Sequence, residues 1–188
     1  MIHAVRLAKY TMSEPSTNLD TTRPSYAAAI TLDAGCAGTD IERAFATVAR
    51  EDFLPPPPWL VFGSAIGLVN TTSDPADLYC DGLVAIDKDK GINNGQPSLH
   101  ARWISAVAPK KGETIVHIGC GGGYYSAILA RLIGPEGHVH AYEIEPGVAA
   151  LAEKSLAGYL NVTVHAVSGA APGLPQADVI YVNAAATT

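Results

Sequence analysis

The second half of the chain alternates short apolar runs with stretches of helical spacing. Apolar runs rich in β-branched residues predict strands, and apolar residues that recur every three or four positions predict helices. From residue 113 the predicted order is strand, helix, strand, helix, strand, strand, at 114–119, 124–134, 138–144, 146–160, 161–167 and 177–185. Such alternation is typical of an α/β fold with a doubly wound, mostly parallel sheet and right-handed crossovers.

The first half shows weaker patterns, and we divide the sequence accordingly. Residues 1–39 are predicted to be an N-terminal lead-in that is partly disordered, because residues 1–25 mix Thr, Ser, Pro and charges without a clear period. Residues 40–112 are predicted to form a subdomain of helices and loops. Residues 113–188 are the α/β half.

Two helices are predicted within the middle segment. The first begins near Asp40 and ends before the prolines at 55–58, which cannot continue a helix. Residues 60–95 are predicted to be loops with one or two short strands. The second helix covers residues 96–109, and its apolar face is expected to lie against the next unit. That face contains Leu99, Trp103, Ile104 and Val107.

Four glycines lie within five positions directly after the first strand of the α/β half, in IGCGGGYY. Ligands of open α/β sheets bind beyond the carboxyl ends of the strands, and the first strand-to-helix turn is the usual contact. Gly119, Gly121 and Gly123 lack Cβ atoms, so the backbone can turn sharply and approach a ligand closely. The free N–H groups of the following helix face that ligand.

The spacing of these glycines separates two cofactor classes. A dinucleotide fingerprint needs a glycine at the sixth position, where Tyr124 stands. A G-x-G-x-G turn followed by an acidic residue at the end of the second strand fits better, because Glu143 can accept hydrogen bonds from both ribose hydroxyls. These features resemble S-adenosylmethionine-dependent methyltransferases. In the alternative, the glycines only form a tight turn and Glu143 caps the next helix.

Composition narrows the class of protein. Hydrophobic residues make up 48% and charged residues 16% of 188 residues, which is typical of one packed α/β domain. A net charge of −6 without a Lys/Arg cluster argues against a nucleic-acid partner and favours a peptide or small molecule. No apolar stretch is long enough for a membrane span or a signal peptide. We therefore expect a soluble protein without a membrane partner.

The cysteines favour a reducing compartment. Cys36, Cys80 and Cys120 are widely spaced, so they match neither a disulfide framework nor the short spacing of a zinc site. We expect a cytoplasmic location and no metal. Cys120 lies inside the glycine loop, where a redox role is one interpretation and a small side chain tolerated between glycines is the other.

Five segments resemble the protein-L-isoaspartate O-methyltransferase family in order and approximate spacing. They are AFATVAREDFLP (44–55), LYCD (78–81), GQPSLHARWI (95–104), VHIGCGGGYYSAILARLIGPEGHVHAYEIEP (116–146) and DVIYVNAAA (178–186). The resemblance covers roughly residues 40–188. It implies a seven-stranded Rossmann-like methyltransferase fold, and methyl transfer from S-adenosyl-L-methionine to a peptide or protein carboxylate. In that family the carboxylate belongs to an isoaspartyl residue, and the reaction serves protein repair.

The resemblance also implies roles for individual residues. Residues 113–188 become the Rossmann-like cofactor-binding half, and the substrate loop lies within residues 40–112. The implied cofactor-binding residues are His117, Gly119, Cys120, Gly121, Gly123, Tyr124, Glu143, Ile144, Ser168 and Gly169. The implied catalytic residues are Asn94, Gly95 and His100. Of Tyr124 and Tyr125, one is expected to pack and the other to line the cofactor pocket.

Three positions depart from the family pattern. His117 replaces an acidic residue two positions before the first loop glycine, and Ser168 replaces an Asp expected near the adenine amino group. Gly95 replaces a Ser, for which Asn94 could substitute by a one-residue shift of the loop. His100 matches a His of some family members; the alternative is a solvent-facing side chain on an amphipathic helix.

The predicted strand at 178–183 would lie at the edge of a sheet ordered 3-2-1-4, yet it is as apolar as a central strand. The family adds three further strands on that side. We therefore expect a fragment, a truncated reading frame, or a subunit whose edge another chain completes. The alternative function is a degenerate methyltransferase-like domain that binds cofactor or peptide without turnover.

Overall fold

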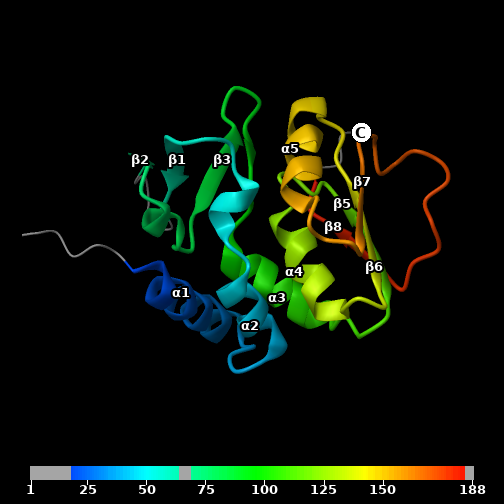
Figure 1. Ribbon diagram of the computed structural model, residues 1–188, viewed down its shortest axis with the longest axis horizontal. Coiled ribbons are helices and arrows are strands. Elements are labelled where there is room, and N and C mark those ends of the chain that lie inside the picture. Colours follow the sequence, from blue (N-terminus) through cyan, green and yellow to red (C-terminus); the bar gives the residue numbers. More distant parts are fainter. Residues whose placement is uncertain (1–17, 64–68, 185–188) are drawn as a thin grey trace, which may run out of the picture.

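The computed structural model describes residues 18–63 and 69–184 and contains two sheets (Figure 1). A parallel sheet has the order β7-β6-β5-β8, and an antiparallel sheet has the order β2-β1-β3-β4. The parallel strands are β5 (Thr114–Ile118), β6 (His138–Tyr142), β7 (Val162–His165) and β8 (Val179–Val182). This confirms the predicted α/β class and the predicted strand order.

Two helices cover one face of the parallel sheet, α4 (Tyr124–Ile133) and α5 (Pro146–Leu156). The β-branched and small residues of the strands point into this layer, and Ile115, Val139 and Ala141 are fully buried there. Burying one large aliphatic side chain contributes about 1.5–3 kcal/mol, so this layer is a main source of stability. The register places Ile118 beside Tyr142 and Val182, so the strands end together.

The segment expected to be a lead-in contains a helix, α1 (Leu19–Ala34). Asn18 caps its start, because the Asn18 side chain accepts a hydrogen bond from the N–H of Asp20 at 2.9 Å. Tyr26, Ala27 and Ile30 are buried in the core. The segment expected to be a partly disordered lead-in therefore contains an ordered helix at residues 19–34, while residues 1–17 lie outside the described residues. Pro24, with Thr and Ser around it, made the stretch resemble a loop.

The middle segment begins with helix α2 (Asp40–Thr47), as predicted, followed by a short 3-10 helix, η1 (Arg50–Phe53). The prediction of one or two strands in residues 60–95 is wrong. The segment contains β1 (Trp59–Phe62), β2 (Val69–Thr72), the 3-10 helix η2 (Pro75–Leu78), β3 (Leu83–Asp87) and β4 (Ile92–Asn93). Strands this short become stable only through pairing, which local sequence does not show.

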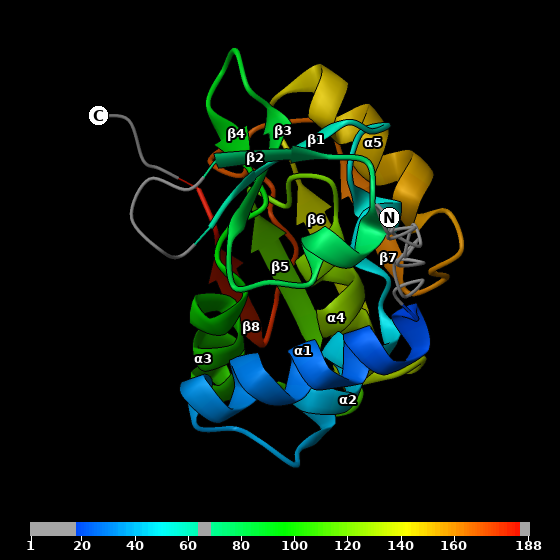
Figure 2. The ribbon, with the colours of Figure 1, turned by 90° about the vertical axis from the view of Figure 1, so that its left-hand side faces the viewer.

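The antiparallel sheet lies across the carboxyl ends of β5 and β6 (Figure 2). Two close approaches show how near it comes to the loop after β5. A Cβ built on Gly121 would lie 3.2 Å from Cδ1 of Ile86, in β3. Lys90, in the β3–β4 turn, forms an ion pair with Glu145 at the start of α5. The antiparallel sheet therefore covers the end of the parallel sheet where ligands of α/β folds bind.

Helix α3 (Pro97–Val107) is present as predicted, but it turns a different face inward. Leu99, Trp103 and Val107 are 36%, 40% and 39% exposed, so of the predicted apolar face Ile104 alone is buried. His100 and Ala101 occupy the interior instead. The polar side chain of His100 can be buried there because its ring has a hydrogen-bond partner and a stacking partner, described below.

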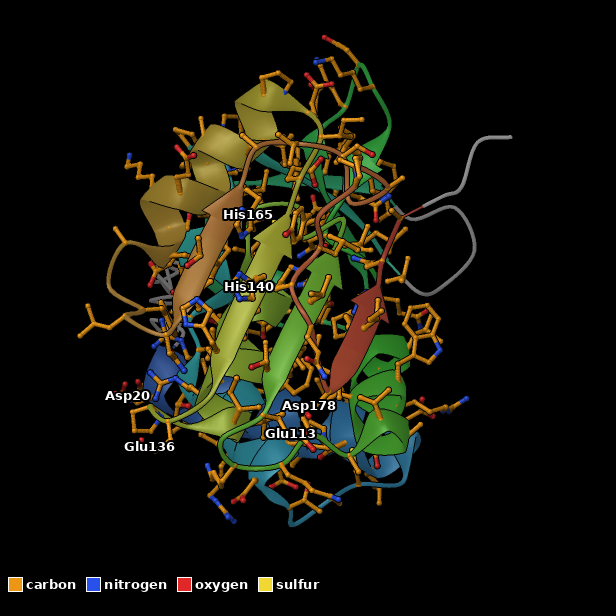
Figure 3. The ribbon with its side chains drawn as sticks, turned by 90° about the vertical axis from the view of Figure 1, so that its right-hand side faces the viewer. Asp20, Glu113, Glu136, His140, His165 and Asp178 are labelled. Carbon is orange, nitrogen blue, oxygen red and sulfur yellow. The ribbon has the colours of Figure 1, made fainter. Side chains whose placement is uncertain are left out.

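The face of the parallel sheet opposite α4 carries polar side chains (Figure 3). His140 on β6 and His165 on β7 lie side by side there, with Nδ1 of His140 3.1 Å from Nε2 of His165. Strand β8 lies at the sheet edge, as predicted, and exposes Ile180 and Val182. None of the helices in the described ranges is long and apolar enough to cross a membrane.

Candidate functional site

The glycine loop follows β5 and is held against the neighbouring strands. The N–H groups of Gly119 and Cys120 both donate to the carbonyl of Tyr142, at 2.8 and 3.0 Å. A Cβ on Gly119 would lie 2.6 Å from the carbonyl oxygen of Asn183, and the φ of Gly119 is 76°. The position therefore requires glycine both for its backbone conformation and for space.

Gly122 is a further required glycine that the sequence pattern did not single out. A Cβ at this position would lie 2.0 Å from the carbonyl oxygen of Phe53 in η1. The sequence pattern assigned roles to alternate glycines only, and the contact with η1 depends on packing between distant segments. Gly122 thus fixes how closely the first half of the chain approaches the loop.

Glu143 follows β6 and joins the glycine loop to helix α5. Its Oε2 accepts a hydrogen bond from the N–H of Gly121 at 2.9 Å, and its Oε1 accepts one from the N–H of Glu145, the residue before α5, at 3.0 Å. Glu143 therefore bonds to the residue that precedes α5, while α5 itself has no side-chain cap bond. A carboxylate offers about four acceptor positions, so two remain for a ligand. The next residue, Ile144, is exposed at the same edge.

His117 lies beneath the loop, inside the core. It is fully buried, its Nδ1 is 2.8 Å from Oγ of Ser126, and its Nε2 has no partner among the described residues. Burial lowers the pKa of His117 to about 3, so the ring is neutral. The side chain is 0% exposed, so it supports the loop from below, and its role as a cofactor contact stays a prediction.

Cys120 and Tyr124 are packing residues in this structure. Burial, followed by the charge of Glu143, raises the pKa of the Cys120 thiol to about 12, so it stays protonated and unreactive. Tyr124 is buried, with ring centroids 6.1 Å from Phe45 and 5.8 Å from Phe53. A cofactor-lining role for Tyr124 is not supported. Tyr125, the next residue, instead reaches the 94–100 segment.

The 94–100 segment contacts the start of α4 through Tyr125. The Tyr125 hydroxyl donates to the carbonyl of Gly95 at 3.3 Å, and its ring stacks on His100 with a centroid distance of 3.5 Å and an interplanar angle of 4°. Because Tyr125 lies two residues after Gly123, this contact places the segment beside the glycine loop. In the sequence His100 and Gly119 are 19 positions apart, and the fold brings the two motifs together.

Asn94 is a structural residue. Its Oδ1 accepts hydrogen bonds from the N–H of Val84 at 2.8 Å and from Nη2 of Arg50 at 3.2 Å, and it is 6% exposed. The side chain ties β3 to the segment and turns away from the surface. Its amide oxygen is used in these two bonds, and its substitution for a catalytic serine stays a prediction.

His100 is buried, which excludes the solvent-facing interpretation. Its Nδ1 is 2.7 Å from the hydroxyl oxygen of Tyr181 in β8. Burial, followed by electrostatic repulsion from His117 and Arg50 on the protonated ring, lowers the pKa of His100 to about 3. Tyr181 was missed from sequence because it sits inside the apolar run of β8.

Two charged residues, Arg50 and Asp81, support the 94–100 segment through hydrogen bonds. The buried guanidinium of Arg50 donates to the carbonyls of Leu78, Cys80 and Gly82, at 2.5, 2.9 and 2.7 Å. Asp81 accepts from the N–H and from Oγ of Ser98, both at 2.7 Å. Both belong to motifs quoted above, and neither was assigned a role.

Ser168 and Gly169 follow β7 and lie at the same end of the sheet as the glycine loop. A Cβ on Gly169 would lie 2.6 Å from Cγ2 of Ile118, the last residue of β5. Oγ of Ser168 accepts a hydrogen bond from the N–H of Ala170 at 3.2 Å. Both residues are partly exposed at this end of the sheet.

Known proteins resemble the chain over this region. Residues 33–188 match the family model described as protein-L-isoaspartate(D-aspartate) O-methyltransferase. A protein-L-isoaspartate O-methyltransferase of Ignicoccus hospitalis is 40% identical over 95 residues, which are 48% of this chain and 44% of that protein. One of Thermotoga maritima is 28% identical over 149 residues, 76% of this chain and 42% of that protein.

Solved structures show the same fold. A protein-L-isoaspartate O-methyltransferase gives a TM-score of 0.60 at 24% identity and covers 85% of this chain and 47% of that chain. A Plasmodium falciparum structure of the same family name, in complex with S-adenosyl-L-homocysteine, gives 0.56 at 15% identity and covers 77% of this chain and 62% of that chain.

The chain spans about half the length of the curated relatives it matches. The family model nevertheless covers most of the chain, including the glycine loop, Glu143 and the 94–100 segment. The chain therefore belongs to the protein-L-isoaspartate O-methyltransferase family.

Proposed function

We propose that the protein is an S-adenosylmethionine-dependent methyltransferase that methylates a carboxylate of a peptide or protein, in particular an isoaspartyl residue. One observation carries the proposal: the Glu143 carboxylate binds the N–H of Gly121, which joins the glycine loop to the end of the neighbouring parallel strand. This arrangement brings backbone N–H groups and a carboxylate together at the end of the sheet where α/β folds bind ligands. The names of the relatives supply the reaction class.

In this proposal the site residues have separate roles in binding the cofactor and the methyl acceptor. Gly119, Gly121 and Gly123 let the backbone approach the cofactor, and Glu143 uses its free acceptor positions for the ribose hydroxyls. Ile144, with Ser168 and Gly169, would contact the adenine. His100 at the 94–100 segment would meet the methyl acceptor. His117 and Tyr124 support this site from the core without touching the ligand.

The bound cofactor supplies an activated methyl group, so the protein mainly has to position the acceptor. A carboxylate is ionised near pH 7 and needs no general base. Alignment of its oxygen with the methyl carbon and exclusion of water are therefore the contributions expected from the chain. The antiparallel sheet over the carboxyl ends of β5 and β6 is suited to exclude water there.

A calorimetric titration with S-adenosyl-L-homocysteine tests the cofactor part of the proposal. Binding is expected with the wild-type chain. No detectable heat at millimolar ligand would reject the proposal and also the alternative of a degenerate domain that still binds cofactor. Binding without methyl transfer would leave the degenerate domain as the correct description.

We also place the protein in the cytoplasm as part of this proposal. All three cysteines are free, and two of them, Cys36 and Cys120, are buried. A reducing compartment keeps such thiols unpaired. Fractionation of cells that express the chain would test the location.

A further inference from the structure

Three histidines lie outside the candidate site, on the face of the parallel sheet opposite α4. His138 and His140 are two positions apart on β6, and His165 ends β7 beside Tyr142, so all three share this face. Nδ1 of His140 lies 3.1 Å from Nε2 of His165 (Figure 3). His138 is separate from this contact, because its Nε2 lies 2.8 Å from Oγ1 of Thr163. His140 and His165 are therefore a pair whose ring nitrogens face each other.

Neighbouring side chains hold the two rings of this pair. The ring of His165 stacks on Tyr142, with a centroid distance of 4.4 Å and an interplanar angle of 13°. The ring of His140 packs against His138, with a centroid distance of 4.7 Å. Metal-binding histidines depend on such surrounding contacts for the orientation of their rings. The two imidazoles are therefore oriented before a ligand binds.

Both rings are neutral near pH 7, which is the form that binds a metal. Burial, followed by repulsion from His138 and His165 on the protonated ring, lowers the pKa of His140. Burial, followed by repulsion from His138, lowers the pKa of His165. In the hydrogen bond one of the two facing nitrogens carries a proton. Moving that proton to the other nitrogen of the same ring leaves both facing nitrogens with a free lone pair.

The separation of the two nitrogens fits one metal ion. Zn²⁺ binds an imidazole nitrogen at about 2.0–2.1 Å, so two such ligands at a tetrahedral angle lie about 3.3 Å apart. The observed separation is 3.1 Å. Within residues 18–63 and 69–184 no three His, Cys, Asp or Glu side chains are grouped to hold a metal, so water has to complete the coordination. Imidazole ligands favour late transition ions such as Zn²⁺ and Cu²⁺ over Mg²⁺ and Ca²⁺.

We propose that His140 and His165 bind one Zn²⁺ ion between β6 and β7, with water at the remaining positions. The inference is independent of the proposed function. Each imidazole gives one lone pair to the ion and keeps its proton on the other ring nitrogen, so no proton is released. Two protein ligands are fewer than zinc sites usually have, so the expected affinity is about micromolar. The ion would link the two strands beside the carbonyl of His165, which accepts the N–H of Glu143 at 3.1 Å.

Two measurements with ZnCl₂ on the full chain test the site. Calorimetry is expected to show one ion bound per chain. His140→Gln and His165→Gln should each weaken this binding at least about tenfold, because each removes one of two protein ligands. Nitrogen-15 NMR of labelled histidine in the wild type is expected to show the largest shifts at Nδ1 of His140 and Nε2 of His165. The NMR measurement does not depend on the folding of any variant.

His138→Gln is the matched control, because His138 lies on the same face but bonds to Thr163. His3→Ala controls for an imidazole outside the described residues. Both variants should bind Zn²⁺ like the wild type. No detectable heat at millimolar ZnCl₂, or NMR shifts confined to other histidines, would overturn the inference. So would equal affinities of His140→Gln and the wild type.

Discussion

The carboxylate of Glu143 and the backbone N–H of Gly121 lie 2.9 Å apart, and this hydrogen bond fixes the glycine loop to the strand beside it. The same carboxylate accepts the N–H of Glu145, so one side chain sets both the loop and the start of α5. A group with both its oxygens engaged, and with acceptor positions left, is pre-oriented for a ligand that brings hydroxyl donors.

Glu143→Gln should weaken binding of S-adenosyl-L-homocysteine by at least about tenfold. The amide loses the negative charge that strengthens these hydrogen bonds, and its NH₂ group cannot accept from an N–H. Calorimetry measures the change. Glu153→Gln, on the exposed side of α5, is the matched control and should bind like the wild type. Equal affinities for both variants would contradict the role of Glu143.

Gly122→Ala should lower the stability of the protein because its methyl group would collide with the carbonyl of Phe53. The expected loss is about 3 kcal/mol, or a fall in Tm of roughly 6–12 °C for a domain of this size. Thermal unfolding followed by circular dichroism measures it. Gly158→Ala is the control, since no atom lies within 4 Å of its Cβ position. A Tm for Gly122→Ala equal to that of the control would show that η1 does not pack on the loop.

The sequence predicted the parallel half well and the first half poorly. Strands such as β5 and β6 are buried, and their apolar runs are continuous, so each strand can be predicted from its own residues. By contrast, β1 to β4 have two to five residues each and depend on pairing with one another. Helix α1 was missed for a different reason. Pro24 and its polar neighbours hide the helical pattern, and the buried face consists of Tyr26, Ala27, Ile30 and Thr31.

In the site, the sequence identified the segments correctly but not every side chain. Glu143 and the loop glycines lie together as the motif spacing indicated. The side chains of Asn94 and His117 instead point inward, where Asn94 bonds to Arg50 and His117 bonds to Ser126. Tyr181 and Gly122 were missed since their roles depend on contacts across the fold. Residue spacing carries no information about such contacts.

Arg50→Met should destabilise the fold by about 3–5 kcal/mol, because it leaves the buried carbonyls of Leu78, Cys80 and Gly82 without a donor. Urea denaturation at pH 7 gives the free energy of unfolding. Arg43→Met is the matched control: Arg43 pairs with Asp40 on the surface, and its removal should change stability by less than about 0.5 kcal/mol. If the two variants were equally stable, the assignment of Arg50 as the central support of the 94–100 segment would be wrong.

Stability should fall as the pH drops from about 6.5 toward 3. His100 and His117 have pKa values lowered from 6.5 to about 3, mainly by burial. In this window the unfolded chain binds protons that the folded protein does not, so acid favours unfolding, by up to about 1.4 kcal/mol per pH unit for each histidine. Above pH 6.5 neither residue contributes to the slope. Urea denaturation at pH 7, 6 and 5 should show the loss.

The variant His117→Asn isolates one of these two contributions. Asparagine does not titrate and can still bond to Ser126, so the dependence of stability on pH should become shallower. The readout is the slope of stability against pH, because this slope depends on whether residue 117 takes up a proton. The absolute stability of the variant is not used. A slope identical to that of the wild type would contradict the low pKa of His117.

The most direct test is transfer of a labelled methyl group from S-adenosyl-L-methionine to a peptide that contains one isoaspartyl residue, compared with the same peptide containing normal Asp. The account predicts base-labile label, as expected for a methyl ester, on the isoaspartyl peptide and little on the Asp peptide. Label on neither peptide, from a chain that binds S-adenosyl-L-homocysteine, would contradict it.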